Sequence, residues 1–184
     1  MNRVLNLPNL LTLARMLLTP FIVYAILEQQ PELALLFMVA AGMTDMLDGA
    51  IARMFNQRTV VGAYMDPLAD KLMLISAIVT LYAMGQVPLF LFLAIVFRDI
   101  VIILGAIAYE IVTRKLTMAP TVTSKITTFF QITLVLSVLV QMGWGIMPDW
   151  LMLGLEWLTF AFTVLSGIQY MVVWMGKALN DEST

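Results

Sequence analysis

Six apolar segments follow one another along the chain with only short breaks between them, at residues 10–28, 32–56, 62–84, 88–114, 119–142 and 149–178. A helix needs about 20 mainly apolar residues to cross a bilayer. Of the 184 residues, 61% are hydrophobic and only 12% are charged, so little of the chain remains for a soluble part. The pattern predicts an all-α integral membrane bundle of six transmembrane helices, forming a single domain over residues 1–184.

The positions of the lysines and arginines predict the orientation of this bundle. The connections at 28–32, 85–88 and 142–149 contain neither residue, whereas the opposite side carries Arg3, Arg53, Arg58, Arg114, Lys115 and Lys177. Cytoplasmic connections are enriched in lysine and arginine, so we expect both termini in the cytoplasm. Residues 2–9 are expected to form a short interfacial segment before the first span. No presequence for organelle import is visible, and the expected location is the bacterial inner (plasma) membrane.

The chain contains no cysteine and no histidine. A disulfide framework, a thiolate nucleophile and a thiolate or imidazole metal site are therefore excluded. Any catalytic acid, base or metal ligand must come from carboxylates, hydroxyls or backbone groups. Such ligands favour hard divalent cations over zinc.

Four aspartates lie in largely apolar surroundings. Asp45 and Asp48 are three residues apart and share one helix face, and Asp66 and Asp70 are four apart and share another. A short connection joins the second and third spans, so these spans should be antiparallel neighbours whose aspartates converge near one membrane surface. Four carboxylates so close together would repel one another strongly at reduced dielectric.

This repulsion must be balanced by protons, by the neighbouring Arg53 and Lys71, or by metal ions. Two divalent cations would balance four carboxylates, and paired metal ions are known to clamp phosphoryl oxygens. One alternative is that the aspartates are ordinary ion-pair partners of the two basic residues. A second is a cation or proton pathway, which predicts acids throughout the membrane depth, whereas these cluster at one level.

Small residues accompany the aspartates. Gly49 and Ala52 lie on the face of the first aspartate pair, and Gly62 precedes Asp66 by four residues. Tight helix packing is the simplest explanation of one small residue in a membrane, but their alternation with carboxylates favours a bulky ligand close to the backbone. Arg53, one turn beyond Gly49, adds a guanidinium suited to a phosphate.

The full spacing is Asp45-x-x-Asp48-Gly49-x-x-Ala52-Arg53, eight residues, then Gly62-x-x-x-Asp66-x-x-x-Asp70. It resembles the complete signature of the CDP-alcohol phosphotransferase family. The likeness extends more loosely from Asn6 to the sixth span. It implies a six-helix membrane fold, usually homodimeric, whose site opens to the cytoplasmic interface.

The resemblance also implies roles for the signature residues. Asp45, Asp48, Asp66 and Asp70 would bind two divalent cations, magnesium or manganese. Asp70 would act as the general base on the acceptor hydroxyl, and the CDP group would be bound by Gly49, Ala52, Arg53 and Gly62. The implied reaction is phospholipid synthesis, in which a phosphatidyl group passes from CDP-diacylglycerol to an alcohol and CMP is released.

Two subfamilies differ in the acceptor alcohol. Phosphatidylglycerophosphate synthases, which use glycerol 3-phosphate, typically show Arg-Glu in the fourth span and a second arginine eight residues after the first. This chain has Arg98-Asp99 followed by Ala106, and its segment 119–128 resembles the cardiolipin synthases more closely. Phosphatidylglycerol is therefore the predicted acceptor, and glycerol 3-phosphate is the alternative.

Three further basic residues, Arg98, Lys125 and Arg15, are candidate contacts for the acceptor or for a lipid phosphate. Lys125 could instead extend to the membrane interface, and Arg98 could be a structural partner for Glu110 or for an acid on another helix. Adjacent helical residues point apart, so we do not expect Arg98 to pair with Asp99.

Overall fold

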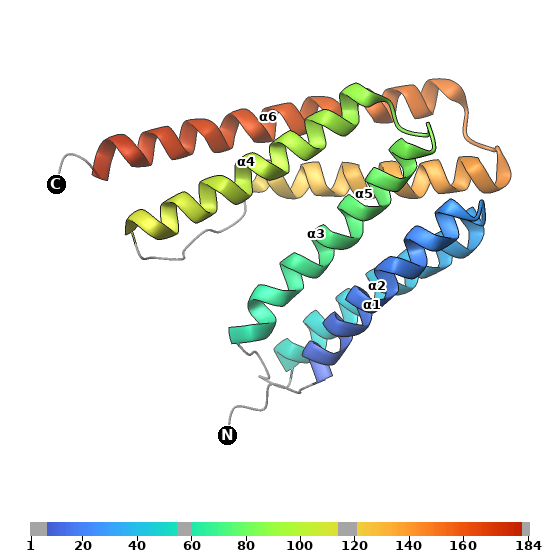
Figure 1. The fold of residues 1–184 in the computed structure, drawn as a ribbon, viewed down its shortest axis with the longest axis horizontal. Helices are drawn as coiled ribbons and strands as arrows, with labels where there is room; N and C mark the ends of the chain where they lie inside the picture. Colours follow the sequence, from blue (N-terminus) through green and yellow to red (C-terminus); the bar gives the residue numbers. More distant parts are fainter. Residues whose placement is uncertain (1–6, 55–59, 114–120, 182–184) are drawn as a thin grey trace. The chain divides into compact units, whose positions relative to one another are not determined.

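The computed structural model describes the backbone of residues 7–54, 60–113 and 121–181, and the side chains of residues 10–44, 65, 68–105 and 121–172 (Figure 1). This part of the chain is all-α. Its six helices are α1 (Leu7–Leu27), α2 (Pro31–Met54), α3 (Val60–Ala83), α4 (Leu89–Thr113), α5 (Val122–Trp144) and α6 (Asp149–Asp181). The predicted all-α class is confirmed, and each helix lies within a few residues of its predicted segment. Of the expected interfacial segment at residues 2–9, residues 2–6 lie outside the description, and α1 already begins at Leu7.

Prolines mark the starts of three helices. Pro31 is the first residue of α2, and Pro88 and Pro148 stand immediately before α4 and α6. Proline suits this position because its fixed φ matches a helix and its missing N–H would have no partner in the first turn. The carbonyls of Pro88 and Pro148 accept the first backbone hydrogen bonds of their helices.

Helices α1, α3 and α5 are each followed, within two residues, by a residue in the left-handed conformation. Gln29, Gly85 and Gly145 have φ of 58°, 72° and 64°, the conformation that allows the last carbonyls of a helix to be bonded by the turn that follows. The backbone N–H of Gln30 donates to Ala25 and that of Gln86 to Leu81, both at 2.9 Å. The carbonyls at the ends of these helices are therefore bonded within the chain itself.

The chain divides into two compact units. The first comprises residues 1–86 and 135–147, and in it α1 packs against both α2 and α3. Alanines bring these helices close together, since small side chains allow near approach in membrane bundles. The fully buried alanines of this unit include Ala34, Ala41, Ala69 and Ala77.

The second unit comprises residues 87–134 and 148–184, and in it α4 packs against α6. Aromatic side chains contribute to the packing. Phe90 of α4 stacks on Trp157 of α6 with ring centroids 5.3 Å apart, and Phe130 of α5 stacks on Phe162 of α6 at 4.8 Å.

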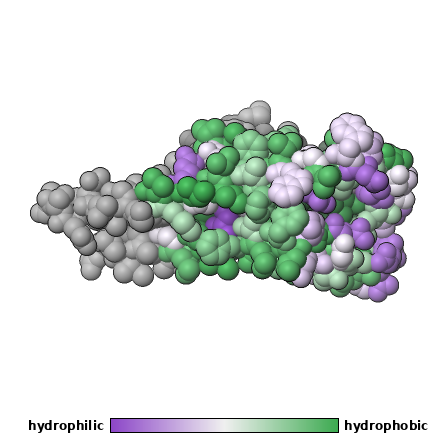
Figure 2. All heavy atoms as spheres, turned by 90° about the horizontal axis from the view of Figure 1, so that it is seen from above, coloured by the Kyte–Doolittle hydropathy of each residue, from purple (hydrophilic) through white to green (hydrophobic). Residues whose placement is uncertain are grey.

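Large hydrophobic side chains are exposed on every described helix, and on the face drawn in Figure 2 hydrophobic residues cover most of the described surface. A water-soluble chain would not expose so much apolar area. Among the described residues, three helices are long and apolar enough to span a bilayer, at Leu10–Leu27, Val122–Trp144 and Asp149–Val172. A shorter apolar stretch, Pro31–Thr44, belongs to α2. These findings support a membrane protein, and the count of six spans stays a prediction, as does the single domain.

Candidate functional site

The signature residues are carried by α2 and α3. Asp45 and Asp48 lie in the helical backbone of α2, and Asp66 and Asp70 lie in that of α3, so the predicted helical spacing of each pair is present. Both helices pack on α1. The side chains of Asp45, Asp48 and Asp66 lie outside the description, as do those of the predicted CDP-binding residues Gly49, Ala52, Arg53 and Gly62.

Asp70, the predicted base, is described together with a partner that we did not predict. Nη1 of Arg15 lies 2.5 Å from Oδ1 of Asp70, although 55 residues separate them in sequence. The arginine side chain is fully buried, whereas the Asp70 side chain is 47% exposed. The pair thus joins α1 to α3 and leaves much of the carboxylate accessible.

Arg15 belongs to a buried polar stripe on α1. Thr12 and Thr19, one turn before it and one turn after, are also buried, and the Thr19 hydroxyl donates to the Arg15 carbonyl at 3.2 Å. A charged side chain inside a membrane helix needs a partner of opposite charge or several hydrogen bonds. That rule, applied to an arginine in an otherwise apolar segment, indicated that Arg15 needs an acidic partner, without indicating that the partner is Asp70.

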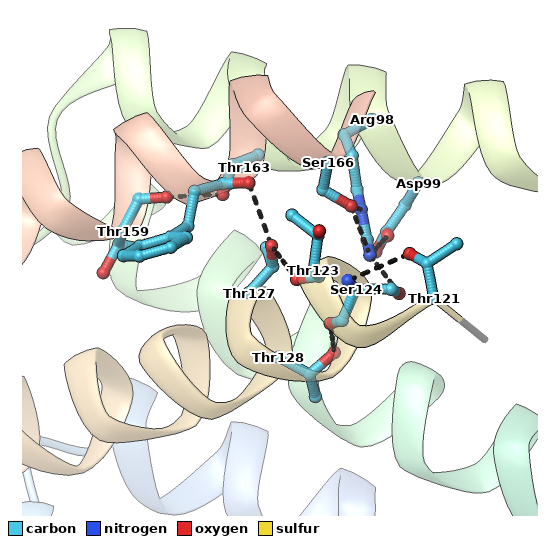
Figure 3. A network of polar contacts seen from close by, with 11 residues as sticks. Arg98, Asp99, Thr121, Thr123, Ser124, Thr127, Thr128, Thr159, Thr163 and Ser166 are labelled. Atoms are coloured by element: carbon cyan, nitrogen blue, oxygen red, sulfur yellow. Dashed lines mark hydrogen bonds and ion pairs between the residues drawn. The ribbon is translucent and has the colours of Figure 1, made fainter. Parts of the chain in front are cut away.

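Arg98 lies in a second buried polar cluster, formed by α4, α5 and α6 (Figure 3). Its Nη1 donates to Oδ1 of Asp99 at 2.7 Å, its Nη2 donates to the hydroxyl of Ser124 at 2.5 Å, and both Nε and Nη2 donate to the hydroxyl of Ser166, at 3.3 and 3.1 Å. We refer to these four residues as the Arg98 cluster. Threonines 121, 123, 127, 128, 159 and 163 lie around it in Figure 3.

The expectation that Arg98 would not pair with Asp99 is wrong. The rule behind it compares the directions of neighbouring Cα–Cβ bonds, which diverge on a helix. An arginine, however, carries its donors on a planar fork at the end of a long flexible stem, and this stem allows Nη1 to reach the neighbouring carboxylate. Glu110, the other acid considered, lies outside the described side chains.

The sequence model of the CDP-alcohol phosphatidyltransferases matches residues 5–169, a stretch that includes the eight signature positions and Arg15, Arg98 and Lys125. The chain belongs to this family. The predicted resemblance is thereby confirmed.

Individual relatives in the family carry two kinds of name. A CDP-diacylglycerol–glycerol-3-phosphate 3-phosphatidyltransferase of Aquifex aeolicus is 33% identical over 178 residues, which is 96% of each chain. The human cardiolipin synthase (CMP-forming) is 33% identical over 174 residues, covering 86% of this chain and 58% of the human one. A probable cardiolipin synthase (CMP-forming) of Drosophila melanogaster is 39% identical over 104 residues, or 56% of this chain and 32% of its own.

CDP-alcohol phosphatidyltransferases generally depend on divalent cations. Among the described side chains of this family member, no group of three or more histidines, cysteines or acids could hold a metal ion. Three of the four predicted ligands lie outside that set. Asp70 itself fits the expected donor type, since it presents a half-exposed carboxylate with oxygen ligands.

Lys125, the last of the three basic residues predicted to contact the acceptor or a lipid phosphate, is exposed and does not belong to the Arg98 cluster. Its neighbour Ser124 does. We predicted neither Ser124 nor Ser166 as a partner of Arg98. The available sign was the helical spacing of Thr159, Thr163 and Ser166 in α6, all fully buried, because a row of hydroxyls on a membrane helix is typical of a face turned toward protein.

Proposed function

We propose that this chain transfers a phosphatidyl group from CDP-diacylglycerol to a glycerol-type alcohol and releases CMP. The observation that carries the proposal is the family match over residues 5–169, which contains every signature position. It favours the transferase over the cation pathway that the clustered carboxylates also allowed. The names of the relatives, a CDP-diacylglycerol–glycerol-3-phosphate 3-phosphatidyltransferase and a cardiolipin synthase (CMP-forming), support the same class of donor and acceptor.

In the proposed reaction, Asp70 takes the proton of the acceptor hydroxyl, whose oxygen then forms a bond to the lipid-bearing phosphorus while the bond to CMP breaks. The half-exposed carboxylate of Asp70 is accessible to an alcohol. The buried Arg15 holds this carboxylate by its Oδ1, and a general base must be held within hydrogen-bond reach of its proton. Arg15 thus supports the base, in addition to the phosphate contact first expected of it.

The predicted metal ligands are Asp45, Asp48, Asp66 and Asp70, with magnesium or manganese as the ion. Two such cations would offset the charge of the pyrophosphate and of the departing CMP. The small residues Gly49, Ala52 and Gly62 would let the CDP group approach the helix backbone, and Arg53 would donate to its phosphates.

Phosphatidylglycerol is the proposed acceptor, which would make the enzyme a cardiolipin synthase. Ala106 in place of a second arginine, eight residues after Arg98, supports an acceptor without a free phosphate monoester. Glycerol 3-phosphate is the second candidate, and the Aquifex relative, matched over nearly its whole length, favours it. In either case Arg98 and Lys125 are the proposed contacts of the acceptor phosphate.

We further propose a six-span homodimer in a bacterial inner membrane, with both termini and the site facing the cytoplasm. The lysine- and arginine-free connections support this orientation. A cysteine-free chain is well suited to testing it. Single cysteines introduced at Gln30 and Gln86 should react with a membrane-impermeant maleimide only from outside the cytoplasm.

The activity is tested with the purified protein, CDP-diacylglycerol and magnesium. CMP release that depends on a glycerol-type alcohol is the expected result, and its absence with every such acceptor would overturn the proposal. The acceptor is identified by offering phosphatidylglycerol, glycerol 3-phosphate, inositol and serine together and determining the lipid product. Cardiolipin as the main product supports the first candidate, and phosphatidylglycerophosphate supports the second.

A further inference from the structure

The Arg98 cluster holds one guanidinium from three helices. Donors on all three nitrogens of the group are engaged, by Asp99 of the same helix, by Ser124 of α5 and by Ser166 of α6 (Figure 3). The α6 backbone also lies against the aliphatic part of the arginine, since a Cβ added at Gly167 would be 3.8 Å from Cγ of Arg98. The orientation of the guanidinium is thus fixed both by its bonds and by its stem.

The cluster is buried and balanced in charge. Arg98 is 3% exposed and Ser166 is fully buried, and the Asp99 side chain is 7% exposed. One carboxylate offsets the positive charge, and the other two acceptors are neutral hydroxyls. Hydroxyls can orient a guanidinium without adding negative charge that would repel an anionic ligand.

One N–H group of the Arg98 guanidinium is not used by the hydrogen bonds of the cluster. A guanidinium has five N–H groups. The four hydrogen bonds of Arg98 use the Nε–H, both N–H groups of Nη2 and one of Nη1. Within the part of the chain that the structure describes, the second N–H of Nη1 is therefore the donor that remains for another acceptor.

We propose that Ser124 and Ser166 are positioning residues, which hold the guanidinium of Arg98 so that this remaining N–H donates to an anionic oxygen of the acceptor phosphate. The proposal rests on the proposed function, in which Arg98 contacts the acceptor. The serines act through Arg98 and do not touch the reacting atoms. Pre-formed orientation of this kind improves binding because the cost of ordering the donor is met before the ligand arrives.

The test compares acceptor kinetics in Ser124→Ala and Ser166→Ala variants of the full chain, in mixed micelles with CDP-diacylglycerol and magnesium. CMP release is measured against phosphatidylglycerol and, separately, against glycerol 3-phosphate. We expect the KM for the accepted alcohol to rise about 10-fold in Ser166→Ala, which loses two hydrogen bonds, and less in Ser124→Ala. Both kcat and the KM for CDP-diacylglycerol should change less than about two-fold.

Two conservative variants separate positioning from packing. Ser124→Thr keeps the hydroxyl at a half-buried position and should retain the wild-type KM. Ser166→Cys keeps the size of the side chain but offers only a weak acceptor, so it should fold and show the same rise in acceptor KM that is expected for Ser166→Ala. It therefore provides the measurement if the alanine variant fails to fold. Thr133→Val is the matched control, because that hydroxyl donates to the Phe129 carbonyl in its own helix.

An unchanged acceptor KM in Ser166→Cys and Ser124→Ala, with an active wild type, would overturn the positioning role. Alanine variants that lose both kcat and thermal stability, with no recovery in Ser124→Thr, would also overturn it. That result would show that the serines serve only packing. A wild type that releases no CMP with any acceptor is a different result, since it contradicts the proposed function itself.

Discussion

Two buried arginines of this chain are each paired with an aspartate, and the two pairs differ in what they expose. Arg15 is fully buried, but its partner Asp70 has a side chain that is 47% exposed. Arg98 and its partner Asp99 are both nearly inaccessible, at 4% and 7% for their side chains. The first pair joins two helices that are distant in sequence, whereas the second joins neighbours on one helix and is completed by hydroxyls.

The difference in exposure indicates that the two Arg–Asp pairs have different roles. A buried cation beside a half-exposed carboxylate holds a group that can still meet a substrate or a metal ion. In a pair that is buried at both ends, the carboxylate is not accessible to a substrate or a metal ion. The group that remains for another partner is an N–H of the guanidinium. Chemistry at the carboxylate is therefore expected at Asp70 and not at Asp99.

The largest expected effect follows from exchanging each carboxylate for an amide. Asp70→Asn should lower turnover by about 10²- to 10⁴-fold, the usual contribution of a general base, while the protein remains folded. Asp99→Asn should keep most of the turnover at saturating substrate but lower the melting temperature. CMP release and thermal unfolding in detergent measure the two quantities, and near-normal activity of Asp70→Asn would remove its role as base.

The next effect concerns stability. Arg98→Met takes the cation away from the inaccessible Asp99 and should lower the free energy of unfolding by about 3–5 kcal/mol. The double variant Arg98→Met/Asp99→Leu removes both charges and should recover most of that loss. Its acceptor KM should stay raised, since the donor is still missing. A double variant as unstable as the single one would contradict the view that the pair is costly to break but replaceable.

Arg15→Lys should have a smaller effect, mainly on activity. A lysine keeps the positive charge beside Asp70 but loses the planar fork that fixes the carboxylate. We expect turnover to fall about 10-fold with little loss of stability, because a half-exposed carboxylate can be hydrated. The comparison is with Leu17→Ala, an exposed position on the same helix, which should leave turnover unchanged. A turnover of Arg15→Lys equal to wild type would show that a positive charge beside Asp70 is enough and that the planar guanidinium is not needed.

The smallest effect is expected at Thr127. Its hydroxyl donates to the carbonyl of Phe162 on α6 at 2.9 Å, and also lies 2.9 Å from the Thr123 carbonyl of its own helix. Interhelical hydrogen bonds in membrane proteins contribute about 0.6 kcal/mol, so Thr127→Val should lower the free energy of unfolding by about that amount. A loss several times larger would mean that the hydroxyls around the Arg98 cluster act as one network.

The sequence predicted the helices well because their determinants are local. Apolar length located the six segments, and prolines marked three of the helix starts. The glycines at 85 and 145 fall where the breaks were placed, and both have positive φ. Gln29 has the same conformation, and nothing in its residue type predicts a left-handed turn.

The polar partners were harder to predict because they depend on tertiary structure. Nothing in the local sequence connects Arg15 with Asp70, 55 residues away. For Arg98 and Asp99 a local rule was available and misled, since it considered the direction of the side chains and not their reach. The arrangement of the four signature aspartates and of the CDP-binding residues remains a prediction from spacing and family.

The three tight turns have a consequence for how the protein enters its membrane. Each is closed by main-chain bonds at a left-handed residue, Gln29, Gly85 or Gly145, and the third is reinforced by the Gln141 side chain, which accepts from the Met147 N–H at 2.8 Å. None needs a lysine or an arginine to bind the last carbonyls of its helix. In the proposed orientation these are the segments that must be translocated during insertion. Because the backbone itself closes these helix ends, no lysine or arginine of the three turns has to cross the bilayer during insertion.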